Sequence, residues 1–228
     1  MPAQIHILSA GAVQPGLSKV IEIFRHESGD EVIVSFATAP AIAKRIAAGE
    51  VFDIAITPQQ VVEELATQEK IASDNRTMLG RIGVGVMIRT GAPLPNIATV
   101  EALKAALISA DSLVFNQAST GLYLENLFDR LGITEQVKNK ATRYPDFAAV
   151  LDHVAKGHGS EIAFGATTVI IENAGKGVRL VGPLPAAIQN YTTYAAALSA
   201  NASPAARTLL HYLATPAARE IFTAAGIE

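Results

Sequence analysis

The chain has 228 residues, 50% of them hydrophobic, and a formal net charge of -3. This length and hydrophobic content are sufficient for one large or two smaller buried cores. Its 18 basic and 21 acidic residues are spread along the chain, which argues against a nucleic-acid partner. No apolar run is long enough for membrane insertion, and the absence of cysteine excludes disulfides and thiolate chemistry.

The N-terminal part of the chain is predicted to form repeated strand–turn–helix units. Short apolar runs predict strands at residues 5–8, 32–34 and 52–56. Between these runs, apolar residues recur at the spacing of a helix. Small residues form the turns after the first two strands, at Gly11, Ala12, Thr38 and Ala39. Thr57 and Pro58 are expected to cap and start a helix over residues 59–70. Residues 32–57 therefore predict a β-α-β unit with a parallel strand pair.

The same alternation continues to the end of the chain. Strands are predicted at residues 83–88, 113–115, 162–165, 178–181 and 191–198. Helices are predicted at residues 100–107, 122–131, 147–154, 205–214 and 216–224. Residues 189–194 (QNYTTY) are unusually polar and aromatic for a strand of this kind. Alternating strands and helices predict an α/β fold with mainly parallel sheets.

Several stretches, in order, resemble a known family. They are SAGAV, VSFATAPAIAKRIAAGEVFDIAIT, LGRIGVGVMIR, STGLYLENLFDRLGI, EIAFG, GPLPAAIQNYTTYAAAL and YLATPAAREIFTAAGI. The chain resembles, over essentially its full length, the molybdate-binding-protein-like group of ABC transporter substrate-binding proteins, which have the type II periplasmic binding protein fold. The resemblance implies two lobes, one formed by residues 1–80 and 193–228 and the other by residues 81–192. Two hinge strands, near Gly83 and Tyr194, would join them.

The resemblance also implies a function, in which helix N-termini trap a small anion between the lobes as the hinge closes. Such a protein is a monomer that delivers its ligand to an ABC transporter permease, without cofactor or membrane insertion. We therefore expect the chain to be periplasmic if a signal peptide has been removed, and cytoplasmic otherwise, because the given N-terminus shows no signal-peptide pattern.

The predicted pocket departs from the family pattern in a way that bears on the ligand. Ala12 and Ala39 stand where the family has serine hydroxyls, and each missing hydrogen bond to an anion costs about 1.5 to 3 kcal/mol. We therefore expect an organic carboxylate rather than a tetrahedral oxyanion, with Arg81 as a bidentate clamp. The alternative for Arg81 is a surface ion pair. The predicted ligand-binding residues are Gly11, Ala12, Thr38, Ala39, Arg81, Ser119, Thr120, Phe147, Phe164 and Tyr191.

A second function is compatible with the same scaffold. Aconitate isomerase is similar to this group of binding proteins, and an allylic proton shift on a tricarboxylate needs only an anion site and a positioned acid or base. The candidate groups are Asp53, Asp146 and Tyr191, although an acid such as Asp53 at a strand start more often caps a turn. The histidine spacings match no metal-binding motif, so we expect no metal site.

Overall fold

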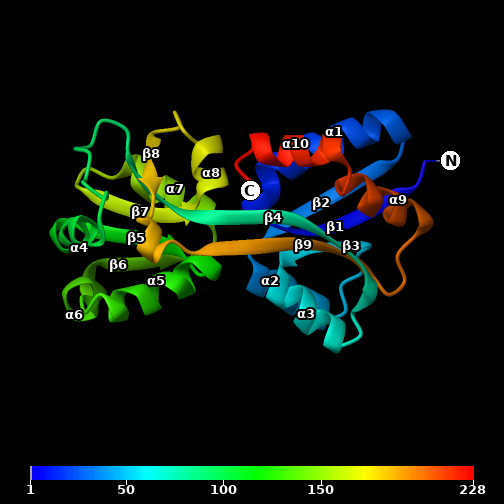
Figure 1. Ribbon diagram of the computed structural model, residues 1–228, viewed down its shortest axis with the longest axis horizontal. Coiled ribbons are helices and arrows are strands. Elements are labelled where there is room, and N and C mark those ends of the chain that lie inside the picture. Colours follow the sequence, from blue (N-terminus) through cyan, green and yellow to red (C-terminus); the bar gives the residue numbers. More distant parts are fainter. Residues whose placement is uncertain (1) are drawn as a thin grey trace. The chain divides into compact units, whose positions relative to one another are not determined.

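The computed structural model describes residues 2–228, except for the side chains of Ser73 and Asp74. The chain divides into two compact units, each described here by itself. Unit 1 comprises Met1–Ile82 and Thr192–Glu228, and unit 2 comprises Gly83–Tyr191. The chain passes between the units twice, within strands β4 (Ile71–Arg89) and β9 (Tyr191–Ser199) (Figure 1).

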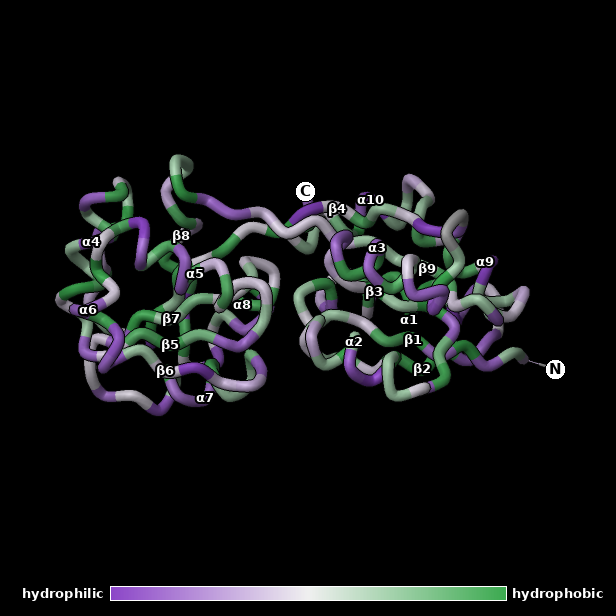
Figure 2. The backbone as a smooth tube through the Cα atoms, turned by 90° about the horizontal axis from the view of Figure 1, so that it is seen from below, coloured by the Kyte–Doolittle hydropathy of each residue, from purple (hydrophilic) through white to green (hydrophobic). Residues whose placement is uncertain are grey.

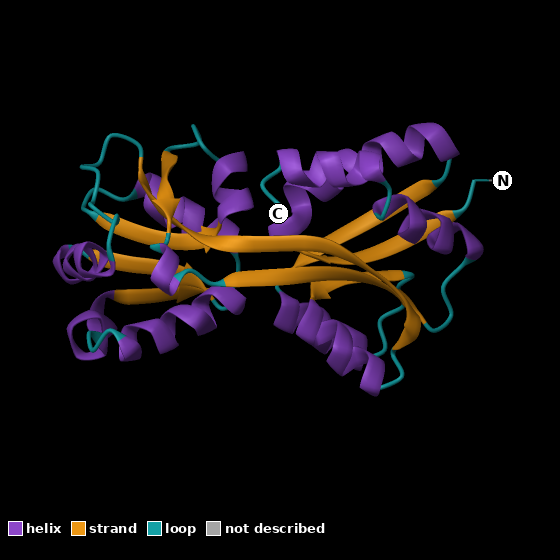
Figure 3. Cartoon of the chain, in the orientation of Figure 1, coloured by secondary structure: helices purple, strands orange, loops and turns teal. Residues whose placement is uncertain are grey.

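Unit 1 contains a sheet in which strands follow the order β2-β1-β3-β9-β4. Its remaining strands are β1 (Gln4–Ala10), β2 (Glu31–Ala37) and β3 (Ile54–Pro58). Its helices are η1 (Gly11–Val13), α1 (Gln14–Ser28), α2 (Ala39–Ala47), α3 (Gln59–Thr67), α9 (Pro204–Leu213) and α10 (Pro216–Ala224). Strand β1 pairs in parallel with both β2 and β3, whereas β9 is antiparallel to β3. Helices α2 and α3 cover one face, and α1, α9 and α10 cover the other (Figure 3).

Unit 2 has its own sheet, in the order β4-β7-β5-β6, with β8 paired to β4. Its strands are β5 (Ser112–Asn116), β6 (Ala141–Tyr144), β7 (Glu161–Ala166) and β8 (Val178–Pro183). Its helices are α4 (Val100–Ser109), α5 (Ser119–Arg130), α6 (Thr134–Val137), η2 (Lys138–Lys140), α7 (Phe147–Lys156), α8 (Thr167–Glu172) and η3 (Ala186–Ile188). Two hydrophobic cores pack against the sheet, one beneath α4 and α5 and one beneath α7 and α8. Strands β5 and β7 are accordingly hydrophobic in Figure 2.

The predicted α/β fold is confirmed, and the sheets are mixed. Among the described strand pairs, β1, β2 and β3 are mutually parallel in unit 1, as are β5, β6 and β7 in unit 2. Every antiparallel pair in these registers involves β4 or β9, the strands that carry the chain between the units. None of the described helices has the length and apolar character needed to span a membrane.

Three local predictions differ from the structure: the start of β4, the end of α3 and the cap of α3. Strand β4 begins at Ile71, well before the predicted start at Gly83, and α3 ends at Thr67. Residues 73–77 are polar and show no alternation, so their extended conformation depends on the sheet rather than on local pattern. Thr57 does not cap α3: its hydroxyl donates to the Pro58 carbonyl oxygen at 3.3 Å, and both residues lie in β3.

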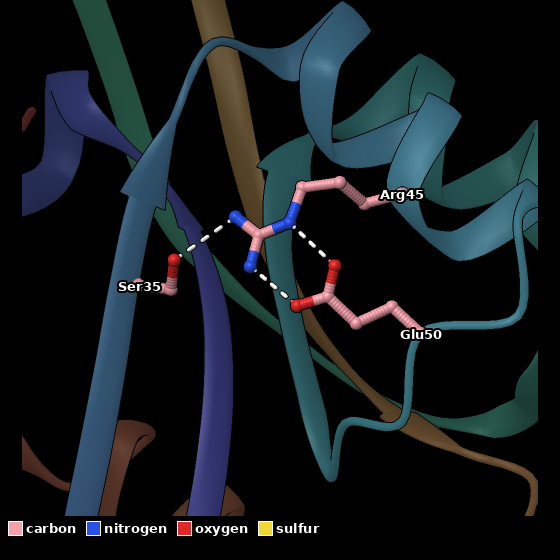
Figure 4. Close-up of polar contacts among 3 residues, drawn as sticks. All are labelled: Ser35, Arg45 and Glu50. Carbon is pink, nitrogen blue, oxygen red and sulfur yellow. Dashed lines mark hydrogen bonds and ion pairs between the residues drawn. The ribbon is translucent and has the colours of Figure 1, made fainter.

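Helix α2 is tied to the sheet by a three-residue polar contact (Figure 4). The Arg45 guanidinium donates from Nε to Glu50 Oε2 at 2.6 Å, and a second nitrogen pairs with Glu50 Oε1. The third nitrogen donates to Ser35 Oγ in β2 at 2.9 Å. This bidentate pairing holds the pKa of the Glu50 carboxyl below its ordinary value and raises the pKa of Arg45. The Arg45 guanidinium therefore joins α2, the loop after it and strand β2.

Replacing Glu50 with glutamine is expected to lower the melting temperature at pH 7. Because the folded-state pKa of Glu50 is depressed, its ionised form stabilises the fold above the ordinary glutamate pKa, and this contribution is lost as the pH falls. The difference between wild type and E50Q should therefore shrink below about pH 4. Thermal unfolding of both proteins between pH 3 and 7 measures it, with the exposed Glu63→Gln as the control. An equal difference at pH 3 and pH 7 would contradict the prediction.

Candidate functional site

Three parallel strands of unit 1 end at one edge of the sheet. Strands β1, β2 and β3 run in the same direction, and each is followed immediately by a helix. The last residues of β1 and β2, Ala10 and Ala37, are register partners, so the turns that follow them are neighbours. The N-termini of η1, α2 and α3 are thereby placed at the carboxyl edge, where ligands bind in open α/β sheets.

None of these three helix N-termini has a side-chain cap among the described residues. Ala10 precedes η1 and Pro58 precedes α3, and neither side chain has an oxygen that could cap a helix. Thr38 precedes α2, and within the described structure its hydroxyl makes no capping hydrogen bond. By contrast, Ser203 and Thr215 cap α9 and α10 in the same unit. Uncapped N-terminal N–H groups carry partial positive charge and suit an anion.

Unit 2 repeats this arrangement at the carboxyl ends of β5, β6 and β7. Ala118 precedes α5 and Ala166 precedes α8, so these two helices also lack a side-chain cap. Helix α7 differs, because the Asp146 carboxylate accepts a hydrogen bond from Ala149 N at 2.9 Å. Helix α4, whose N-terminus follows a loop rather than a strand, is capped by Thr99. Of the helices that follow the ends of β5, β6 and β7, only α7 has a side-chain cap in the described structure.

Gly121 allows α5 to begin directly on the end of β5. A Cβ atom at this position would lie 1.9 Å from the Asn116 carbonyl oxygen, so no larger residue fits without displacement of the helix. The Asn116 side chain accepts from Ala118 N at 3.2 Å, which shapes the same turn. Ser119 and Thr120 form the first turn of α5 and are half-buried. The predicted turn at 119–121 therefore lies at the carboxyl edge of unit 2.

In unit 1 the structure brings together the predicted residues of the first two turns. Gly11 and Ala12 form η1, and Thr38 and Ala39 begin α2 at the neighbouring strand end. Ala39 is 5% exposed, so its side chain presents almost no surface at this edge. Two buried hydroxyls at this edge, Ser9 in β1 and Thr57 in β3, were not among the predicted site residues. Each is a hydroxyl residue within a mainly apolar strand, and this pattern could have indicated them.

The two predicted phenylalanines of unit 2 have different surroundings. Phe147 is the first residue of α7, and its ring covers Gly165 of β7, where an added Cβ would lie 2.5 Å from the ring. Phe164 is fully buried in the core beneath α4 and α5, and its ring meets Phe128 edge to face at a centroid distance of 6.5 Å. Phe147 thus lies at the carboxyl edge, whereas Phe164 has no exposed surface to offer a ligand.

Arg81 forms a surface ion pair, which was the alternative to the predicted carboxylate clamp. Its guanidinium lies 3.1 Å from Glu228 Oε2, and the two side chains are 53% and 57% exposed. The backbone groups of the same residues also pair, with Arg81 N donating to Glu228 O at 2.7 Å and Glu228 N donating to Arg81 O at 2.9 Å. The clamp role of Arg81 stays a prediction, and a ligand carboxylate would have to replace Glu228.

Asp53 lies away from the other candidates. It directly precedes β3, and the strand separates it from the carboxyl edge by about 15 Å. Its Oδ2 accepts from His6 N at 2.9 Å, and its Oδ1 accepts from Ser203 N at 3.1 Å. The Asp53 carboxylate therefore joins β1 to the segment that begins α9, so its role in the described structure is to hold these two segments together.

Replacing Asp53 with alanine is expected to destabilise unit 1 by about 3 kcal/mol, because two backbone N–H groups lose a charged acceptor. D53N keeps one amide oxygen as acceptor and should lose about half as much. Urea unfolding of both variants measures these losses. A catalytic Asp53 would give the opposite pattern, with activity abolished in D53N and stability unchanged.

The tyrosines at the start of β9 differ in exposure. Tyr191 is 42% exposed, whereas Tyr194 is 6% exposed, and burial raises the pKa of the Tyr194 phenol far above its ordinary value. Tyr191 belongs to unit 2, where its ring lies over Gly83 of β4. Among the described residues, no three histidine, aspartate or glutamate side chains gather in a way that could hold a metal ion.

Comparisons with known proteins place the chain among binding proteins. A family model described as "Bacterial extracellular solute-binding protein" matches residues 5–228. An aconitate isomerase from a Pseudomonas species is 28% identical over 232 residues, covering 97% of this chain and 86% of the relative. The molybdate-binding protein ModA of Escherichia coli K12 is 23% identical, covering 96% and 86%.

The fold has close parallels among solved structures. The periplasmic molybdate-binding protein of Azotobacter vinelandii superposes with a TM-score of 0.81 at 16% identity, covering 98% of each chain. This likeness confirms the predicted type II periplasmic-binding-protein-like fold. Because the family match spans nearly every residue, the chain belongs to the bacterial extracellular solute-binding protein family.

Proposed function

We propose that this protein binds a small organic anion, of the di- or tricarboxylate class, as a solute-binding protein. The observation that carries the proposal is the set of uncapped helix N-termini at the ends of β1, β2 and β3 in unit 1. Helices α9 and α10 of the same unit have side-chain caps, whereas the helices that directly follow β1, β2 and β3 have none in the part of the chain that the structure describes. The names of the relatives, which refer to aconitate and molybdate, also denote small anions.

The side chains at these helix ends favour a carboxylate over a tetrahedral oxyanion. Alanine occupies position 12 in the first turn and position 39 in the second, and Thr38 carries the hydroxyl among the predicted ligand-binding residues of these two turns. An oxyanion such as molybdate would therefore find fewer hydroxyl donors in these turns than serines at positions 12 and 39 would provide. A carboxylate could in addition recruit Arg81, because the exposed Arg81–Glu228 pair contributes only about 0–1 kcal/mol and is readily exchanged.

A thermal-shift screen tests the proposal. The ligands are molybdate, tungstate, sulfate, phosphate, citrate, cis-aconitate and trans-aconitate. A ligand present at a thousand times its dissociation constant stabilises the folded protein by about 4 kcal/mol, or roughly ten degrees. We expect the largest shift with a tricarboxylate and a smaller one for Arg81→Ala. A shift with molybdate alone would overturn the carboxylate assignment, and an unchanged affinity in R81A would remove Arg81 from the site.

A second candidate function is isomerisation of a tricarboxylate such as aconitate. The similarity to an aconitate isomerase, at 28% identity over 97% of this chain, favours it. The reaction moves a proton between allylic carbons, so a base removes one proton and an acid returns one. Of the three candidate groups, Asp53 and Asp146 accept backbone hydrogen bonds that give their carboxylates structural roles, and Tyr191 carries a phenol on a residue that is 42% exposed. We therefore propose Tyr191 as the acid or base of this alternative.

Proton NMR of cis- and trans-aconitate in D2O distinguishes the two functions. An isomerase interconverts the isomers and incorporates deuterium, and Tyr191→Phe should slow both processes. Binding without interconversion supports a transport role, with an ABC transporter permease as the partner. The hinge closure implied by the family resemblance stays a prediction, and a smaller radius of gyration with ligand, measured by X-ray scattering, would test it.

A further inference from the structure

The segment that precedes β9 is attached to β4 by the side chain of Gln189. Its Oε1 accepts from Val84 N at 3.0 Å and from Asn190 N at 2.8 Å, while its Nε2 donates to Val84 O at 3.0 Å. The side-chain amide therefore meets both the N–H and the carbonyl of one residue. Only a group with a donor and an acceptor in one plane can do this, and glutamine supplies that group at this length.

Gly83, the residue before Val84, provides the surface on which this segment rests. A Cβ atom at Gly83 would lie 3.2 Å from Gln189 Nε2 and 3.3 Å from Cε1 of the Tyr191 ring. Both side chains therefore approach the space that a Cβ at Gly83 would occupy. The amide of Gln189 is fixed there by three hydrogen bonds, and the Tyr191 ring approaches the same point.

A second contact holds the same segment against α5. The Tyr123 hydroxyl donates to the Ile188 carbonyl oxygen, and Arg130 donates to Tyr123 Oη at 2.9 Å. Tyr123 lies one turn after the Ser119–Thr120 turn of α5. The residue preceding Gln189 is thus fixed to the helix that begins at the carboxyl edge of unit 2, and Tyr191 follows two residues after Gln189.

We infer that Gln189 is a positioning residue, which holds the Tyr191 ring on Gly83 in the orientation used for the ligand. The inference rests on the proposed function together with the sequence-based prediction that Tyr191 contacts the anion. Tyr191 is 42% exposed, and its ring approaches the same point beside Gly83 as the Gln189 amide. Gln189 is fixed at that point by hydrogen bonds to backbone groups of β4, so we expect it to affect the ligand through the orientation of Tyr191.

The first experiment needs no ligand. Carbon-labelled tyrosine allows the ring signals of the five tyrosines to be followed by NMR, with Tyr191→Phe identifying those of Tyr191. Gln189→Leu should shift and broaden the Tyr191 signals. Gly83→Ala should shift them too, because its Cβ meets the ring. The matched control is Gly182→Ala in β8, where the nearest atom is 3.6 Å from the added Cβ. Unchanged Tyr191 signals in Q189L would overturn the inference.

The second experiment is a double-mutant cycle with trans-aconitate as the probe, measured by calorimetry. Q189L should weaken affinity about tenfold in the wild-type background and have no further effect in Tyr191→Ala. An equal loss in both backgrounds would show that Gln189 acts only on the fold, and would overturn the inference. If the wild type does not bind the probe, the carboxylate proposal fails, and the NMR result decides the positioning role by itself.

Discussion

Gly121→Ala is expected to lower the free energy of unfolding by about 2 kcal/mol and to weaken anion binding. The added Cβ would lie 1.9 Å from the Asn116 carbonyl oxygen, which is backbone and cannot rotate away. Alanine is better than glycine in a helix by about 1 kcal/mol, so the variant gains from propensity. Overpacking of this severity costs about 3 kcal/mol, which outweighs that gain. The first turn of α5 must therefore move away from β5 or fray.

Urea unfolding and a thermal-shift titration with trans-aconitate measure the two effects. Gly182→Ala is the matched control, because its added Cβ meets only Ile97 at 3.6 Å. That variant should lie within about 0.5 kcal/mol of the wild type. If G121A were as stable as G182A, α5 could not begin as close to β5 as the structure shows. If G121A were destabilised but bound as tightly as the wild type, the α5 N-terminus would not contact the ligand.

The sequence predicted those features that depend on neighbouring residues. A buried strand followed by a small-residue turn and helical spacing is a local pattern, and the turns at Gly11, Thr38 and Ser119 lie at strand ends as predicted. The same local reasoning missed the first half of β4. Residues 73–77 are polar and show no alternation, so no local pattern marks them as part of β4.

The roles of individual side chains depended on contacts that no local pattern contains. Asp53 bonds to Ser203, which is 150 residues away, and Gln189 bonds to Val84, which is 105 residues away. An acid at a strand start and a glutamine before a strand have many possible partners, and only the fold selects among them. The polar run at 189–194 was a signal that this segment was unusual, but it did not indicate which residue was the anchor.

Phe164→Ala is expected to destabilise unit 2 by about 4 kcal/mol, with little change in ligand affinity for the protein that remains folded. Phe164 is fully buried, and it continues a row of edge-to-face rings in which Phe115 and Phe128 have centroids 6.0 Å apart. Truncation would remove the ring and leave a cavity. The exposed Leu122→Ala is the control, expected to change stability by less than about 0.5 kcal/mol.

Phe164→Tyr separates a core role from a ligand role more sharply than truncation does. Phe164 is one of the ligand-binding residues predicted from the sequence, and in that role an added hydroxyl could bind the anion, so a ligand role predicts tighter anion binding at unchanged stability. In the structure the new hydroxyl would enter an apolar core, which costs about 1–3 kcal/mol without a partner. We therefore expect F164Y to unfold at lower urea concentration and to bind trans-aconitate no more tightly than the wild type. A gain in affinity would return Phe164 to the ligand site and would require its ring to be accessible when the ligand binds.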